Sequence, residues 1–277
     1  MYRTLIAGAG YVGGAIAAYF RSKNQKVWGI IQTPERQSAL EQIGVVPIIV
    51  DVTCPETLTS LPAVDFVVIA LSPVERNEEN YRRIYLEGIR NLLFKIKTSF
   101  SPLLIVYISS SGVYPDLAGK WVDEVTEPKP DTEEGKILLE AEKQVLTFGL
   151  PAIVFRLAGI YGPTRNRIRF VKEGKWQPPT VDKYMNMIHR DDIVTAMPVL
   201  FNRAEVGQVY LGVDDEPVRR SEFFYWLCQK LGMPTQKIET SQKILGKRCQ
   251  NARLKSLGFS FKYPTFREGY SALLEAK

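Results

Sequence analysis

Short apolar runs alternate with amphipathic stretches along residues 1–162. Runs typical of buried strands lie at Thr4–Ala7, Lys26–Gln32, Val45–Val50, Asp65–Leu71, Leu103–Ser109 and Ala152–Leu157. Stretches with apolar residues at helical spacing follow three of them, at Tyr11–Phe20, Glu78–Lys97 and Glu133–Phe148. Strands that alternate with helices are typical of βαβ units and a parallel sheet. The pattern predicts an α/β fold, a Rossmann-type doubly wound parallel sheet.

The pattern loosens after Gly162. Residues 174–185 are polar and have no clear period, whereas Ile193–Phe201 and Arg220–Leu231 have helical spacing and Gln208–Val213 is strand-like. We therefore predict a large domain over residues 1–162, which later segments near 186–201 rejoin. Residues 163–277 are predicted to form most of a smaller C-terminal lobe.

Composition excludes several classes of protein. The chain of 277 residues is 45% hydrophobic and 24% charged, which is typical of a globular protein. Its three cysteines show no Cys-x-x-Cys spacing, so neither a disulfide framework nor a metal site is predicted. The longest apolar run, residues 66–71, is much shorter than the roughly 20 residues that cross a bilayer. With no basic, apolar leader in the sequence, we expect a cytoplasmic protein with no membrane partner.

Positive charge is concentrated in the second half. Residues 1–150 carry 15 Lys and Arg against 18 Asp and Glu, whereas residues 151–277 carry 21 against 12. One reading is a solvated basic surface, and the other is an electropositive mouth that attracts an anionic small molecule. Nucleic acid is not expected, because aromatic residues do not interleave with the basic cluster as stacking platforms would. That cluster consists of Arg165, Arg167, Arg169, Lys172 and Lys175.

A glycine-rich loop lies between the first predicted strand and the first predicted helix. It reads Gly8-Ala9-Gly10-Tyr11-Val12-Gly13, the Gly-x-Gly-x-x-Gly pattern of dinucleotide-binding folds. In that pattern the first glycine makes a tight turn and the second lets the backbone approach a pyrophosphate. The third lets the helix pack on the strand, so that the helix N-terminus faces the phosphates. We predict a dinucleotide site at Gly8, Gly10, Tyr11, Val12 and Gly13.

The end of the second strand bears on the choice between NAD and NADP. NAD-binding proteins usually carry an acidic residue there, which holds the ribose hydroxyls. Here Gln32 occupies that position, which removes the repulsion against a 2′-phosphate, and Arg36 is close enough in sequence to bind one. The sequence favours NADP, with NAD possible.

Several segments in order along the chain resemble the short-chain dehydrogenase/reductase superfamily, on its extended or atypical branch, the NAD-dependent epimerase/dehydratase type. Beside the glycine loop, the matching segments are Asp51-Val52, Ile69–Leu71, Gly88–Leu93, Ile108–Tyr114, Arg156–Pro163 and Met187–Asp192. The resemblance implies that Asp51 and Val52 contact the adenine and that Ala70 and Leu71 line the cofactor. It also implies action on sugars, nucleotide sugars or other small alcohols and carbonyls.

Members of this family use a Tyr-x-x-x-Lys pair and a serine. The tyrosine acts as acid and base, the lysine lowers its pKa and holds the ribose, and the serine orients the substrate oxygen. The resemblance assigns the serine role to Ser110, three residues before Val113. The one Tyr-x-x-x-Lys of this chain, Tyr19 to Lys23, lies on the helix after the glycine loop and is predicted to point away from the site.

The helix predicted at residues 133–148 lacks the pair in either of two registers. If Lys136 is the active lysine, Thr132 stands in the tyrosine position. If the register is anchored on Glu142, Glu134 replaces the tyrosine and Leu138 the lysine. The predicted catalytic residues are therefore Ser110, Thr132 and Lys136.

Three explanations for the missing tyrosine remain open. Glu134, Tyr161 or the single histidine, His189, could act as the acid, although a lone histidine is more often structural. Thr132 could instead orient a substrate or water that carries the proton. Otherwise the chain performs no hydride chemistry.

These alternatives give two hypotheses of function. The first is an NAD(P)-dependent oxidoreductase or epimerase/dehydratase that acts on a small, anionic, sugar-like or carbonyl substrate. Its substrate would lie between the sheet and residues 168–187. The second is a non-catalytic NAD(P)-binding regulator or redox sensor. The family often pairs through two helices, here residues 78–97 and 133–148, but both carry many charges, so a monomer is as plausible as a homodimer.

Overall fold

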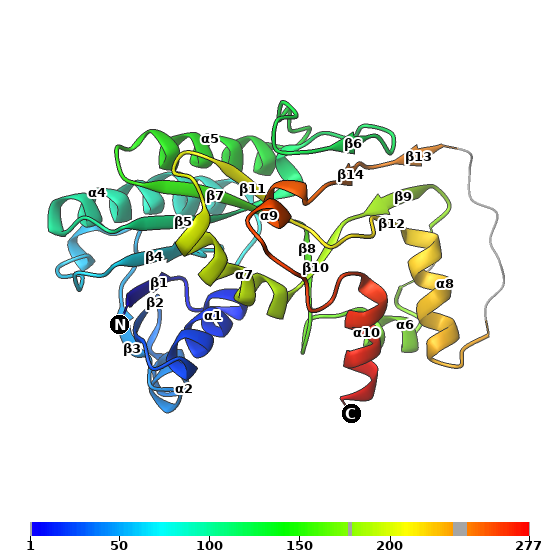
Figure 1. Cartoon of the computed structure of the whole chain (residues 1–277), viewed down its shortest axis with the longest axis horizontal. Helices are drawn as coiled ribbons and strands as arrows, with labels where there is room; N and C mark the ends of the chain where they lie inside the picture. The colour runs from blue at the N-terminus through cyan, green and yellow to red at the C-terminus, as the bar shows by residue number, and fades with distance from the viewer. Residues whose placement is uncertain (1, 177–178, 235–242, 277) are drawn as a thin grey trace.

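The computed structural model describes residues 2–176, 179–234 and 243–276, and its centre is a seven-stranded sheet (Figure 1). The strands lie in the order β11-β7-β5-β4-β1-β2-β3, and all neighbours are parallel. The order reverses direction between β1 and β4, as in doubly wound sheets, and this confirms the predicted fold class. The strands are β1 (Arg3–Ala7), β2 (Lys26–Ile31), β3 (Val46–Ile49), β4 (Phe66–Ile69), β5 (Leu104–Ser110), β7 (Ala152–Leu157) and β11 (Val209–Gly212).

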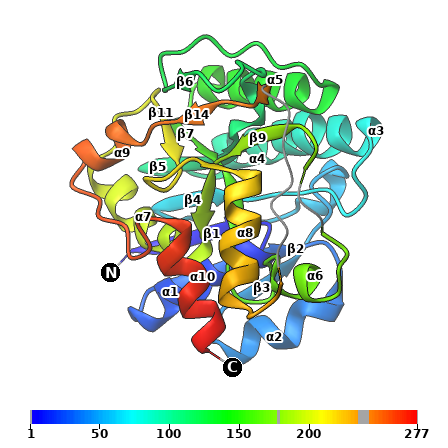
Figure 2. The same cartoon turned by 90° about the vertical axis from the view of Figure 1, so that its right-hand side faces the viewer.

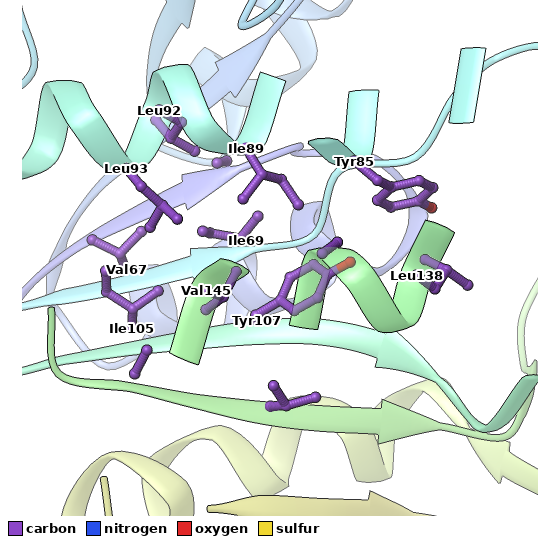
Figure 3. Close-up of a cluster of buried hydrophobic side chains, with 14 of the residues drawn as sticks. Val67, Ile69, Tyr85, Ile89, Leu92, Leu93, Ile105, Tyr107, Leu138 and Val145 are labelled. Carbon is purple, nitrogen blue, oxygen red and sulfur yellow. The ribbon is translucent and has the colours of Figure 1, made fainter. Parts of the chain in front are cut away.

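Helices cover both faces of this sheet (Figure 1). One face packs against α1 (Tyr11–Ser22), α2 (Gln37–Gln42) and α7 (Arg190–Arg203), whose buried side chains share one apolar cluster with the strands. The other face packs against α4 (Ile89–Ser99) and α5 (Glu133–Thr147), and Figure 3 shows part of that second cluster. In it, the isoleucines and leucines of α4 and Val145 of α5 lie over Val67, Ile69 and Ile105 of the sheet.

The helix predicted over residues 78–97 runs in three parts. These are α3 (Glu78–Tyr81), the π-helical segment η3 (Arg82–Gly88) and α4. Three short 3₁₀ turns stand elsewhere, at η1 (Pro34–Arg36), η2 (Pro55–Thr57) and η4 (Ser111–Val113). Each strand predicted from its apolar run is present with its ends shifted by two residues or fewer.

The C-terminal residues form a smaller lobe beside the sheet, and Figure 2, which views the molecule from that side, shows its helices in front. A third apolar cluster joins α6 (Ile168–Lys172), α8 (Arg220–Lys230) and α10 (Phe266–Glu275), while α9 (Ala252–Ser256) lies against β11. α7 and β11 belong to the large sheet layer, so the chain returns to it after residue 162. The division at that residue stays a prediction.

The described part of the chain contains three very short sheets beside the large one. They pair β8 (Gly159–Tyr161) with β10 (Met187–His189), β9 (Asp182–Met185) with β12 (Val218–Arg219) and β13 (Ile244–Leu245), and β6 (Trp121–Val122) with β14 (Arg248–Cys249). A strand of two to four residues is too short to show an alternation of apolar and polar positions. For this reason the sequence pattern of residues 174–185 predicted no strand. Over the described ranges, no helix is long and apolar enough to cross a membrane.

A buried ion pair connects α5 to the sheet. The guanidinium of Arg156 on β7 donates to both carboxylate oxygens of Glu142 on α5, at 2.7 to 3.1 Å, and the two side chains are 5% and 3% exposed. Glu142 also accepts a hydrogen bond from Ser109 at 2.6 Å, and Arg156 donates to the Tyr114 hydroxyl at 2.7 Å. The pair therefore holds the carboxyl end of β5 and the turn after it.

Replacing one member of this pair leaves the other charge buried and uncompensated. We expect Glu142→Gln to lower the free energy of unfolding by about 3–5 kcal/mol, the usual cost of breaking a buried pair. Urea unfolding followed by circular dichroism measures this, with Glu140→Gln, at an exposed position of the same helix, as the matched control. Equal stability of the two variants would contradict the role given to the pair.

Candidate functional site

A cleft of about 1260 Å³ follows the carboxyl ends of the parallel strands. Its walls come from the residues that follow β1, β2, β4, β5 and β7, together with parts of the C-terminal lobe. In doubly wound sheets this edge, where the strand order reverses, is where ligands bind. Predicted site residues that line it are Gly8, Gly10, Tyr11, Val12, Gln32, Arg36, Asp51, Val52, Ala70, Leu71, Ser110 and Thr132.

The three glycines of the loop have different roles. Gly8 has a φ of +94°, and a Cβ there would lie 2.5 Å from the Ala70 carbonyl oxygen. A Cβ on Gly13, which lies behind the cleft lining, would lie 2.1 Å from the Gly8 carbonyl oxygen, so this glycine lets α1 approach the loop. A Cβ on Gly10 would have Arg36 Nη1 as its nearest described neighbour, at 3.4 Å, so the space over Gly10 opens into the cleft.

The N-terminus of α1 faces that open space. Gly10 is the N-cap of the helix, and Tyr11 and Val12 of its first turn line the cleft. Free backbone N–H groups and the helix dipole at such an N-terminus favour a phosphate group. The residues present therefore fit the pyrophosphate of a dinucleotide.

A polar cluster surrounds Asp51 at one end of the cleft. Gln32 Nε2 donates to its carboxylate at 3.1 Å, Thr53 donates through its hydroxyl and its backbone N–H, and Arg83 lies 3.5 Å away. Burial raises the pKa of Asp51, but the hydrogen bonds from Thr53 and Gln32 and the charge of Arg83 outweigh burial, so its pKa is lowered. The Gln32 amide is thus hydrogen-bonded to a carboxylate. The exposed guanidinium of Arg36 lies next to Gly10.

Ser110 lies at the other end, where β5 stops. Its hydroxyl oxygen accepts from the Gly112 N–H at 3.0 Å, so it caps the 3₁₀ turn η4, and its half-buried side chain also lines the cleft. Ser110 can therefore serve both as a structural cap at the end of the strand and as a contact to a substrate.

The face of α5 that borders the cleft does not carry Lys136. Lys136 lies outside the cleft lining, where its exposed ammonium pairs with Glu133 at 2.6 Å. Leu138 lines the cleft, as does Thr132, whose hydroxyl caps α5 by accepting from the Gly135 N–H. Neither register brings both of its positions into the cleft, since Thr132 lines it without Lys136, and Leu138 lines it without Glu134. In the register anchored on Glu142, an apolar side chain stands in the lysine position.

The alternative acids lie outside the cleft lining. Tyr161 and His189 are 3% and 2% exposed, and burial lowers the pKa of His189 to about 4, so the imidazole is neutral. His189 Nδ1 accepts from the Asp191 N–H and caps α7, the structural role expected of a lone histidine. Glu134 is half-buried and also outside the lining, and Lys23 lies over the ring of Tyr19 on α1.

The basic cluster of the second half is mostly a solvated surface. Arg169 and Lys175 both pair with Glu173, and Arg167 lies over the ring of Trp176. Arg165 lines the cleft and lies over the ring of Tyr11. Within the described residues no group of three His, Cys, Asp or Glu side chains could hold a metal ion.

Sequence reasoning placed the substrate against residues 168–187, and Lys183, Tyr184 and Asn186 of that range line the cleft. It missed residues 245–247, which line the cleft beside Asp116. No local pattern marks residues 245–247, because they reach the cleft through pairing of the two-residue strand β14, which follows them, with β6.

Gly10→Glu places a carboxylate in the open space over the loop without a clash in the backbone, so the protein should fold. We expect binding of NAD and NADP to be lost in calorimetric titration. Gly13→Ala, with its Cβ forced against Gly8, should instead lower the melting temperature. Dinucleotide affinity within a few-fold of wild type in Gly10→Glu would show that the site lies elsewhere.

Comparisons with known proteins identify the family and the fold. Residues 4–210 match the family model described as the NAD dependent epimerase/dehydratase family. Protein YeeZ of Escherichia coli K12 is 27% identical over 272 residues, which cover 95% of this chain and 97% of that protein.

Two solved structures extend the comparison. A protein from Methylobacillus flagellatus, assigned to the NAD-dependent epimerases/dehydratases, is 30% identical, covers 99% of this chain and 98% of its own, and has a TM-score of 0.86. The dTDP-glucose 4,6-dehydratase of Bacillus anthracis, solved in complex with NAD, shares the fold, with a TM-score of 0.80 at 20% identity and coverage of 97% and 94%.

Proposed function

The chain belongs to the NAD-dependent epimerase/dehydratase family, and from that premise we propose that it is an NADP(H)-dependent oxidoreductase or epimerase/dehydratase. The observation that carries the proposal is one continuous cleft along the carboxyl edge of the sheet. It runs from the glycine loop and Arg36 to Ser110 and the C-terminal lobe. An NAD(P) cofactor is typical of the family, and when bound it supplies or accepts a hydride.

The residues around the loop would hold the cofactor. The N-terminus of α1 and the open space over Gly10 suit its pyrophosphate, and Val52, Ala70 and Leu71 offer apolar walls. Gln32 carries no charge that would repel a 2′-phosphate, and Arg36 stands where it can donate to one. This favours NADP over NAD.

At the other end, Ser110 would donate to a substrate carbonyl or alkoxide oxygen, and Thr132 would hold a substrate hydroxyl or a water. The substrate is proposed to be small, anionic, and sugar-like or a carbonyl compound. Lys136 is left out of this assignment, because its ammonium pairs with Glu133 on the exposed side of α5.

A second candidate is a non-catalytic NAD(P)-binding regulator. Leu138, in the lysine position of the register anchored on Glu142, favours it, since a leucine can neither hold a ribose nor lower the pKa of a neighbouring acid. The two candidates share the cofactor site and differ only at the Ser110 end.

Cofactor preference tests the first part of the proposal. We expect calorimetric titration with NAD, NADP and their reduced forms to show tighter binding of NADP and NADPH. Arg36→Ala should weaken NADP binding about 10-fold or more, the value of a charge-assisted hydrogen bond of roughly 1.5–3 kcal/mol, and leave NAD unchanged. Arg90→Ala, an exposed arginine on α4 outside the cleft lining, is the control. Tighter binding of NAD than of NADP would contradict the preference.

An assay of turnover distinguishes the proposed enzyme from the proposed regulator. Oxidation of NADPH with a panel of small carbonyl compounds and sugar phosphates should identify a substrate, and Ser110→Ala should then lower kcat about 10²–10³-fold, as loss of a donor to a developing oxyanion does. Ser111→Ala, one residue further along the same wall, should stay close to wild type. Tight cofactor binding without turnover over the whole panel would favour the regulator.

A further inference from the structure

Lys247 brings a positive charge to the Ser110 end of the cleft from the far end of the sequence. Its half-buried side chain lines the cleft, and its ammonium donates to the Tyr114 carbonyl oxygen at 2.6 Å. Tyr114 lies four residues after Ser110, on the turn that leaves β5. The ammonium is therefore near Ser110 and comes from another segment than α5, the helix in which the family lysine would stand.

The backbone around Lys247 is held from both sides. The Gly246 carbonyl oxygen accepts from Leu117 and Gly119, and the Gly246 N–H donates to Asp116. On the other side, Asn186 donates to the Lys247 carbonyl oxygen at 2.9 Å and accepts from the Cys249 N–H at 2.7 Å. A lysine on so constrained a segment loses little further freedom when it binds a ligand.

The charges around Lys247 leave its ammonium able to bind a ligand. An ammonium has three donors, and the Tyr114 carbonyl takes one of them. Asp116 and Asp131 lie near it and accept from backbone N–H groups, but among the described residues neither carboxylate forms an ion pair with the ammonium. Burial lowers the pKa of Lys247, an effect that Cys249, Asp131 and Asp116 partly offset. A partly desolvated cation of this kind gains more from an anionic ligand than a surface lysine does.

We propose that Lys247 binds an oxyanion of the substrate, a carboxylate or a phosphate, beside Ser110. This rests on the proposed function, since it assigns the anionic group of that substrate to one residue. On α5, the residue that faces the cleft is Leu138, which carries no charge. Lys247 would supply a positive charge to the substrate instead. The ligand's oxyanion accepts from the ammonium while Ser110 faces the reacting oxygen.

Calorimetric titration with two simple probes tests the proposal. Inorganic phosphate and oxalate are titrated into the protein saturated with NADPH, which keeps them from the glycine loop, and into the protein alone. We expect at least one probe to bind wild type, and Lys247→Met to weaken it about 10-fold or more. Lys247→Arg should keep the affinity within a few-fold. The preferred probe indicates whether the substrate carries a carboxylate or a phosphate.

Lys129→Met is the control, because Lys129 is an exposed lysine outside the cleft lining. The proposal is overturned if neither probe binds wild type, if Lys247→Met binds as wild type does, or if Lys129→Met loses as much. Unchanged NADPH affinity in the Lys247 variants shows that they fold. If NADPH fails to bind wild type, the proposed function falls, and the titrations without NADPH still decide the role of Lys247.

A second measurement needs no variant. In trace acetylation with acetic anhydride, read by mass spectrometry, the bound probe should slow the labelling of Lys247 several-fold. Lys129, whose side chain is 69% exposed and outside the cleft lining, should label at the same rate with and without the probe. Equal labelling of Lys247 under both conditions would overturn the proposal.

Discussion

The Glu142–Arg156 ion pair is the interaction on which the arrangement of the cleft depends most. It is almost fully buried, and its hydrogen bonds reach three elements: Ser109 at the end of β5, Tyr114 on the following turn, and α5 itself. Two charges removed from water need well-formed hydrogen bonds to compensate for desolvation, and here each finds several. Ser110 follows Ser109 of this network, the carbonyl that holds Lys247 belongs to Tyr114, and Thr132 caps the helix that carries Glu142. The network therefore connects the segments that carry all three.

Local patterns predicted the large sheet because each of its strands is a short apolar run, and the central ones are buried on both faces. The cofactor end of the cleft was equally accessible to sequence reasoning, since Gly8, Gly10 and Gly13 belong to one continuous segment between a strand and a helix. The geometry of that segment is set by neighbours in sequence. Even the distant members, Gln32 and Asp51, follow the ends of recognisable strands.

The substrate end could not be predicted in the same way. The choice of Lys136 followed a spacing of residue types, whereas the inward face of α5 is set by Ile137, Leu138, Ala141 and Val145, which leave Lys136 exposed. Burial of Glu142 beside them is the part that hydrophobic patterning would not predict. Lys247 depends on pairing between β6 and β14, which are about 125 residues apart and two residues long. The summed charge of the second half was a poor guide as well, because most of the basic cluster pairs with Glu173 or stacks on Trp176.

The short pairing of β14 with β6 also determines when the cleft becomes complete during synthesis. The glycine loop, Asp51 and Ser110 all belong to the first 110 residues, whereas the wall that carries Lys247 is added about 30 residues before the C-terminus. A nascent chain therefore holds the elements of the proposed nucleotide pocket well before those of the proposed substrate end. Changes confined to residues 245–247 would alter the wall beside Ser110 without touching the glycine loop.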